Sequence, residues 1–356
     1  MGHRGAHPRS RGTSGCVTGA AYGSALMGAP RIARWLGSHC ARRLPREFAN
    51  DRLSAFGHET IAVQRMSCGQ WDELLPCLDR IARAFGDLQC TRHRVENQAL
   101  AAKLACYLGQ LEEAHKRFSA MTDEAHARAG GMGELWGLLG QVETGMRLGR
   151  YSPQELHALL ERARRDMTEI ENVDSAYNLR WLGLKTMVAW RSGQIEVARE
   201  TALIAAAVAR RIRFCGFWAH EGFAGPIEVL LRVRAQERQL GGASPILDQA
   251  LACLMRAMRA HVRRFPPGAA RLHQLRGLAA IDAGHSARAV AALRESVSAA
   301  ERYGLRYELA RSCELLAQID CKGTWKQRAQ RLFSEVGAAD DLRRLLEREP
   351  ATVVPG

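Results

Sequence analysis

The sequence predicts an all-α protein, a right-handed α-solenoid of antiparallel helix pairs with a period of about 40 residues. Two observations predict it. Glycines interrupt helical patterns at intervals of 39 to about 48 residues, and the residues at equal distances from these glycines are similar in size and polarity. These glycines are Gly69, Gly109, Gly149, Gly193, Gly241 or Gly242, Gly284 and Gly323. The composition, rich in Ala and Leu with 6% aromatic residues, favours close helix packing over a β fold.

The residues at fixed distances from the glycines set the register of the expected repeat. Five and nine residues after a turn glycine stand small or apolar residues, and seven residues before it stand very small ones. The three sets are Leu74, Ala114, Ala198 and Ala289, then Leu78, Phe118, Ala202 and Leu293, then Ala62, Ala102 and Gly277. Small residues let paired helices approach closely, so Ala289 is expected to be buried where two helices cross.

The clearest single unit is the helix hairpin over residues 271–303. Gly277 and Ala280 lie on its first helix, where a partner helix must come close. Gly284 is expected to adopt a positive φ and to end that helix, because glycine has no Cβ to clash. Ser286 is expected to cap the second helix through its hydroxyl group.

Other local signals place the remaining helix boundaries. Residues Ser152–Glu155 read Ser-Pro-Gln-Glu, a capping box with proline at the first helical position, and Ser244 and Pro245 begin another helix in the same way. The pairs Gly86-Asp87 and Gly130-Gly131 are expected to separate earlier units. These signals predict about seven helix pairs, followed by a polar terminal helix near 340–349.

The chain divides into three parts by composition. Residues 1–49 are expected to form a basic, largely disordered tail, with 1–30 lacking any periodicity and 31–44 fitting one basic helix. Residues 50–349 form the helical-repeat domain, and 350–356 a disordered C-terminus.

Positive charge is concentrated near the N-terminus. The formal net charge is +14, and residues 1–65, with ten Arg and three acidic residues, account for +7 of it. Such a tail suits nucleic acid or an anionic membrane surface, and an Arg-rich composition without any partner is the alternative. In the body of the chain, the densest basic stretch is Arg256–Arg276.

The cysteines and the apolar runs indicate the cellular compartment in which the protein is expected. None of the ten Cys residues forms a C-x-x-C pair, which favours reduced thiols in a cytoplasmic protein over a disulfide framework. The longest apolar run, Ala202–Ala209, has eight residues, whereas a membrane-spanning helix needs about 20. We therefore expect no membrane span.

The motifs that carry enzyme chemistry are missing from the sequence, which predicts no enzyme. The sequence contains no phosphate-binding G-x-x-x-x-G-K-[ST], no H-E-x-x-H zinc motif and no G-x-S-x-G nucleophile motif. We therefore assign no catalytic residue, no cofactor-binding residue and no metal ligand.

Partner binding is expected at two places instead. The segment Phe214–Pro226 breaks the rhythm of small residues with aromatic ones, so Trp218, His220 and Phe223 are candidate contacts, with packing in the core as the alternative. The adjacent basic pair Arg263 and Arg264 are further candidates, and offsetting a helix dipole is the alternative role for that pair.

Several segments resemble known repeats. The segments YLGQLEEAHKRF, GQWDELLPCLDRI and AGHSARAVAALRESV resemble tetratricopeptide-type (TPR) repeats, although the period exceeds the roughly 34 residues of that family. Residues 218–335, which include HEGFAGPIEVLL and AERYGLRYELARSCELLAQ, resemble the C-terminal helical tail of large bacterial signalling proteins. In those proteins an ATPase joined to a nucleotide cyclase or a serine/threonine kinase precedes the tail.

The resemblance and the missing motifs together predict a function. We expect a non-catalytic, regulatory TPR-like scaffold of a bacterial signalling system, with a partner peptide or domain in the concave groove. A kinase, a cyclase or an ATPase is the candidate partner. In a solenoid each unit contacts only its neighbours, which leaves the concave surface free for binding. The alternative is a nucleic-acid-binding regulator that uses the basic tail and the Arg256–Arg276 face.

Overall fold

The computed structural model describes most of the predicted repeat domain. The described residues are 52–88, 91–127, 131–170, 175–212, 215–242, 244–320 and 324–347, together with Ile32 and Trp35. The predictions for residues 1–30, for the rest of the 1–49 tail and for 350–356 lie outside the described residues. So do those for Gly130, Phe214 and Gly323.

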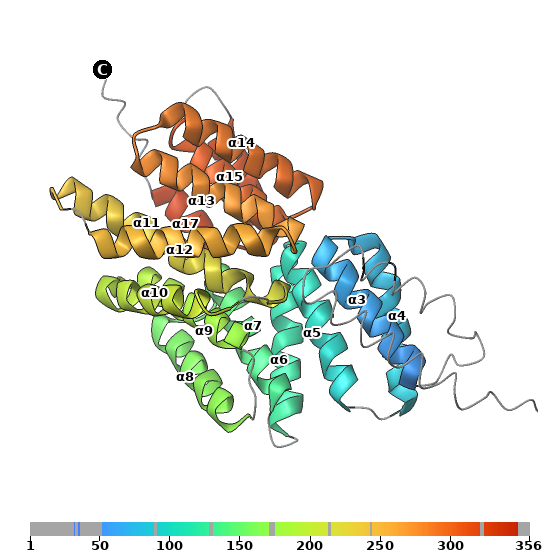
Figure 1. Ribbon diagram of the computed structural model, residues 1–356. Coiled ribbons are helices and arrows are strands. Elements are labelled where there is room, and N and C mark those ends of the chain that lie inside the picture. Colours follow the sequence, from blue (N-terminus) through green and yellow to red (C-terminus); the bar gives the residue numbers. More distant parts are fainter. Residues whose placement is uncertain are drawn as a thin grey trace, which may run out of the picture.

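The described part of the chain is all-α, as predicted, and contains no strand. It has seven successive helix pairs and a last single helix, also as predicted (Figure 1). The helices are α3 (Arg52–Cys68), α4 (Trp71–Leu88), α5 (Thr91–Tyr107), α6 (Leu111–His126), α7 (Met132–Leu148), α8 (Pro153–Glu169), α9 (Ser175–Arg191), α10 (Ile195–Ala209), α11 (His220–Gln239), α12 (Pro245–Val262), α13 (Ala269–Asp282), α14 (Ser286–Arg302), α15 (Arg306–Ala317), α16 (Trp325–Val336) and α17 (Ala339–Glu347). Two short 3₁₀ turns, η2 (Phe217–Ala219) and η3 (Pro266–Gly268), precede α11 and α13.

The two helices of a pair differ in how deeply they lie. In α7, 15 of 17 residues are buried, and in the following α8 only four of 17. The first helices α9, α11 and α15 are also mostly buried, whereas the second helices bury one face each. A helix that is apolar on most sides suits an interior, and an amphipathic helix suits a surface. The first helices therefore form an inner layer and the second helices an outer one.

The predicted register of small residues is confirmed. Ala289 and Leu293 on α14 are fully buried against α13. A Cβ atom added to Gly277 on α13 would lie 2.7 Å from Cγ of Leu293, which leaves no room for a larger residue. Ala114 and Ala198, at the equivalent positions of two earlier units, are also fully buried.

Most predicted turn glycines have the expected left-handed backbone. Positive φ angles between 68° and 79° occur at Gly69, Gly109, Gly149, Gly193, Gly241 and Gly284. The predicted boundary between units at Gly86-Asp87 is wrong by two residues, because α4 continues through this pair to Leu88. Gly304 and Gly337 also have positive φ and follow the ends of α14 and α16. These two glycines were not predicted as turn glycines from the sequence.

The predicted helix starts are partly correct. Ser152 and Glu155 form the complete capping box at the start of α8, as predicted. Ser244 precedes α12, with Pro245 at the first helical position, but its side chain makes no capping hydrogen bond. The prediction for Ser286 is wrong, because α14 already begins at this residue and His285 occupies the capping position.

The early turns pack against the last units of the chain. A Cβ atom added to Gly69 would lie 2.7 Å from both Pro267 and Tyr303, and one added to Gly149 would lie 3.2 Å from Cβ of Asp340. The indole Nε1 of Trp71 donates a 2.7 Å hydrogen bond to the carbonyl oxygen of Tyr303. Figure 1 accordingly shows the start of α13 beside α3.

This closure corrects one expectation of the solenoid prediction. Units at opposite ends of the array touch, so the rule that each unit contacts only its neighbours does not hold for this chain. The turn at Gly109 likewise lies against Arg306 and Val336, whereas a Cβ atom at Gly193 or Gly284 would meet nothing within 4 Å. The turns of the first three units are covered, and those at Gly193, Gly241 and Gly284 are open.

Candidate functional site: a closed interior and an open outer face

Charged side chains from the first helices meet in the interior of the protein. We call this set the central charge cluster. Its members are Lys103 (α5), Glu143 and Arg147 (α7), Arg180 and Arg191 (α9), Glu221 and Glu228 (α11), Arg271 (α13), Arg311 (α15) and Asp341 (α17). Burial of a charge is unfavourable unless opposite charges neutralise it, so the pairing within the cluster decides its role.

Glu143 is the most heavily paired acid of the cluster. Lys103 Nζ lies 2.6 and 2.8 Å from its two carboxylate oxygens, Arg180 donates to it at 2.9 Å, and Arg147 lies 3.4 Å away. Burial alone would raise the pKa of Glu143, but the three cations hold it far below the usual range of a glutamate. Glu143 is therefore a fixed anion and does not serve as a proton donor or acceptor near neutral pH.

Two further groups of ion pairs extend the cluster to the later helices. Arg147 donates to Glu221 at 2.9 Å, which joins α7 to α11. Glu228 binds Arg271 of α13 and Arg311 of α15, the latter at 2.8 Å. Burial raises the pKa of Glu228, but Arg271, Arg311 and Arg232 reverse that shift and keep the carboxylate ionised.

The last helix joins the cluster through Asp341. Arg191 of α9 lies 3.1 Å from its carboxylate, and the hydroxyl group of Tyr307 donates to it at 2.8 Å. Burial raises the pKa of Asp341, and Arg191, Arg311 and Arg344 together bring it below its usual value. The cluster thus ties α5, α7, α9, α11, α13, α15 and α17 into one arrangement, which closes the interior.

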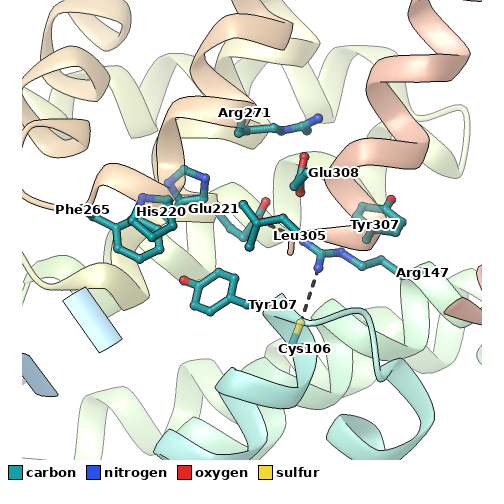
Figure 2. A pocket seen from close by; sticks show the side chains of 11 residues that line it. Cys106, Tyr107, Arg147, His220, Glu221, Phe265, Arg271, Leu305, Tyr307 and Glu308 are labelled. Atoms are coloured by element: carbon teal, nitrogen blue, oxygen red, sulfur yellow. Dashed lines mark hydrogen bonds and ion pairs between the residues drawn. The ribbon is translucent and has the colours of Figure 1, made fainter. Parts of the chain in front are cut away.

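The space left inside the cluster is small. A cavity of about 20 Å³ lies between α5, α7, α11 and α15. Figure 2 shows the side chains that line it. Its lining includes Tyr107, Arg147, His220, Glu221 and Arg271. This volume suits about one water molecule, whereas sites for organic ligands are typically about 300–1,000 Å³.

The cysteine in this cavity is not activated. Burial and the nearby Glu143 raise the pKa of Cys106 to about 11, so the thiol stays protonated at neutral pH and is a poor nucleophile. Among the described residues, no group of three or more His, Cys, Asp and Glu side chains is arranged to hold a metal ion.

The described part of the predicted binding segment Phe214–Pro226, residues 215–226, packs tightly against α9. Gly222 and Gly225 lie inside α11, where a Cβ at Gly222 would approach the carbonyl oxygen of Leu179 to 2.6 Å and one at Gly225 that of Gly183 to 2.8 Å. The irregularity seen in the sequence therefore reflects close backbone contact between α9 and α11. The aromatic and glycine content of the segment fits an exposed binding site as well as a packed core, so composition alone did not distinguish these two alternatives.

The aromatic candidates in this segment lie mostly inside. His220 and Phe223 are buried, and Trp218 is half-buried and stacks on Tyr177 with 5.8 Å between ring centroids. Partner contact by His220 or Phe223 would require the helix to leave its neighbours. Their role in partner binding stays a prediction, with Trp218 the most accessible of the three.

His220 sits in an apolar and cationic environment. Its ring lies 5.6 Å from that of His261 and 5.4 Å from that of Phe265, and no other described residue forms a hydrogen bond with its Nδ1 atom. Burial, followed by the charges of Lys103 and Arg271, lowers the pKa of His220 to about 3. The ring is therefore neutral at physiological pH.

The basic stretch Arg256–Arg276 does not form one face. Arg271 is buried in the central charge cluster, and His261 is buried beside His220. Arg263 is exposed at the end of α12 and Arg264 is half-buried. What remains at the surface of α12 is a row of three exposed arginines, Arg256, Arg259 and Arg263.

Two residues that belong with this row were not predicted from the sequence. Arg210 and Arg211 follow the last residue of α10 directly and are both exposed. The packing of α10 against α12 places the ends of the two helices together. A signal existed in the sequence, because the second helices of two successive units both end in an Arg-Arg pair, 210–211 and 263–264.

Comparison with known proteins does not supply a relative. A scan against models of protein families finds no match to the chain, and a search of curated proteins finds none either. The resemblance to TPR repeats and to the tails of signalling proteins therefore stays a prediction. Within the described ranges, no helix combines the length and apolar character needed to cross a membrane.

Proposed function

We propose that this protein is a non-catalytic helical-repeat scaffold for protein–protein interaction, and that it serves as a regulatory module of a bacterial signalling system. The described interior supports a structural role, because its carboxylates are held as ion pairs and its cavity has room for about one water molecule. We place the binding surface on the outer layer of second helices, whereas the sequence predicted binding in the concave groove.

One observation carries this choice of surface. Of the nine large hydrophobic side chains that are exposed in the described part, five lie on α10, on the turn after α11 or at the start of α12. They are Ile195, Val197, Ile204, Leu240 and Ile246. Contiguous exposed apolar side chains are typical of interaction sites. We therefore propose α10 and α12 as the region that contacts a partner protein, with a kinase, a cyclase or an ATPase as the candidate.

Site-specific photocrosslinking in the source cell tests the proposal. A photoreactive amino acid at Ala252 of α12 or at Ala207 of α10, both exposed on second helices, should give protein adducts. The same group at Glu308, which lines the cavity, should give none. Adducts at Glu308 without adducts at the outer positions would show that the interior opens to bind partners and would overturn the choice of surface.

Nucleic acid is the second candidate partner, because the exposed arginines Arg256, Arg259 and Arg263 form a row on one helix face. Binding to phosphate groups releases counterions and weakens steeply with salt. A titration of duplex DNA between low and moderate salt checks this candidate, and affinity that is absent at low salt would exclude it.

A further inference from the structure

The helices α10 and α12 lie side by side and run in the same direction. Arg199, near the start of α10, lies 3.5 Å from Glu237, near the end of α11, and α11 leads directly into α12. Further along, the thiol of Cys253 in α12 lies 3.7 Å from the carbonyl oxygen of Ala206 in α10. Both helices therefore begin at one edge of the protein and end beyond this contact. We call their exposed residues, with those of the flanking turns, the α10–α12 face.

The first half of the α10–α12 face is apolar with acidic residues between. Val197 and Ile204 are seven residues apart, so they lie on one stripe of α10, and Ile204 is 54% exposed. Ile246 at the start of α12 and Leu240 in the turn before it are 64% and 88% exposed. The acidic residues of the two helices also lie in this half: Glu196, Glu200 and Asp248.

The second half of the face is basic. Arg256, Arg259 and Arg263 are spaced by three and four residues, which places them on one side of α12. At 1.5 Å per residue, Arg210 lies about 6 Å beyond Ala206 along α10, and Arg256 about 4.5 Å beyond Cys253 along α12. The two sets of arginines are therefore level with each other. With Arg211 they make a group of five exposed guanidinium groups.

These five arginines have no ion-pair partner among the described residues, in contrast to Arg234 and Arg238 nearby, which pair with Asp282. Cations near a helix C-terminus offset the helix dipole, which accounts for those that follow the last turn. The dipole does not account for Arg256, six residues before the last residue of α12. An unpaired group of five like charges on one surface is better explained by an anionic partner.

We infer that the α10–α12 face binds an acidic amphipathic segment of a partner protein, an inference that rests on the proposed function. Apolar residues of the segment cover Val197, Ile204 and Ile246, and its carboxylates pair with the arginines, whose guanidinium groups bind carboxylates in a two-pronged geometry. From Val197 to Arg211 the stripe is about 21 Å long, which matches about 14 residues of a helical segment.

The arrangement of side chains favours a protein segment over nucleic acid. Val197 and Ile204 are seven residues apart on one stripe of α10, and the exposed residues Arg210 and Arg211 follow at the end of that helix. The exposed residues of α10 and α12 include no aromatic ring on which a base would stack. Apolar side chains in line with the arginines add contact area for a peptide and little for a phosphate backbone.

Fluorescence anisotropy with the full chain tests this inference. The probe is a synthetic helical peptide of about 14 residues, with Leu in one half and Glu in the other. The two comparison probes are the same peptide with Lys in place of Glu, and a short DNA duplex. We expect binding of the acidic peptide alone, a loss of at least about tenfold in affinity for Arg256→Glu and Arg263→Glu, and a smaller loss for Ile204→Ser.

The matched control is Arg288→Glu on α14, which reverses an exposed arginine on another second helix and should leave the affinity unchanged. Equal losses for Arg288→Glu and Arg263→Glu would show unspecific charge attraction and would overturn the inference. Binding of the DNA duplex but not of the peptide, weakened by Arg256→Glu, would also overturn the inference and would indicate nucleic acid as the partner. Crosslinks at Ala252 without any binding of the acidic peptide would keep the interaction surface and refute the chemistry assigned to the partner.

Discussion

The substitution Glu143→Gln should strongly destabilise the fold, because it removes the one carboxylate that neutralises two buried cations. Lys103 and Arg180 pair with no other acid among the described residues, whereas Arg147 keeps Glu221 at 2.9 Å. Removing one partner of a buried ion pair costs about 3–5 kcal/mol. With two cations left unpaired, we expect the loss in free energy of unfolding near the upper end of that range.

Glu113→Gln on α6 is the matched control. Glu113 pairs with Arg117 at 2.6 Å, but the two side chains are 45% and 48% exposed, and exposed pairs contribute about 0–1 kcal/mol. Urea unfolding followed by circular dichroism measures both variants at pH 7. Adding Lys103→Met to Glu143→Gln should restore part of the loss, since it removes one unpaired charge. Equal, small losses for Glu143→Gln and Glu113→Gln would refute the reasoning.

Three further predictions concern packing, closure and pH. Ala289→Glu should lower the melting temperature sharply, because Ala289 is fully buried at a helix crossing, and an unchanged melting temperature would disprove the repeat register. Gly109→Ala should destabilise more than Gly193→Ala in urea unfolding: both glycines have a positive φ, but only at Gly109 does the added methyl group meet another unit, and equal losses would argue against closure. Stability should fall as pH drops below about 6.5, because burial lowers the pKa of His220 to about 3 and that of His261 well below its usual value, so the unfolded chain takes up protons that the folded chain does not. The loss is about 1.4 kcal/mol per histidine and pH unit, and a urea midpoint that is the same at pH 7.5 and pH 5.5 would contradict it.

The repeat could be predicted from the sequence because its signals are local. A glycine that must adopt a positive φ, such as Gly149, and a small residue opposite a large one, such as Gly277 opposite Leu293, are determined by the few residues around them. The period of about 40 residues is a repetition of such local signals. The all-α class and the number of helices follow from them.

The closure and the central charge cluster could not be predicted in the same way. Their partners are far apart in sequence, 40 residues for Lys103 and Glu143 and 83 for Glu228 and Arg311. Whether they meet depends on the curvature of the array, which sums small rotations between successive units. The sequence contains one indication of the cluster. Charged residues such as Glu143 occur in helices that are otherwise apolar and so have no polar face toward solvent.

The candidate site shows the same division. Arg263 was expected at the surface from the sequence and is found there, whereas Arg271, eight residues later, is buried. The alignment of Arg210 with Arg256 requires knowledge of how α10 packs on α12. The sequence shows which helix a charge belongs to, and only the packing of helices shows which charges share a face.

The distance between the third unit and the last helix tests the central claim, closure of the array, most directly. Arg150, after α7, and Arg343, on α17, are exposed and suit the attachment of two fluorophores through bioorthogonal amino acids, which avoids the ten native cysteines. Closure places the labels close together, because a Cβ atom added to Gly149 would lie only 3.2 Å from Cβ of Asp340, and it predicts high energy transfer. In an open array, five helix-pair steps of roughly 10 Å would separate them by about 50 Å, and low transfer at that distance would contradict the account.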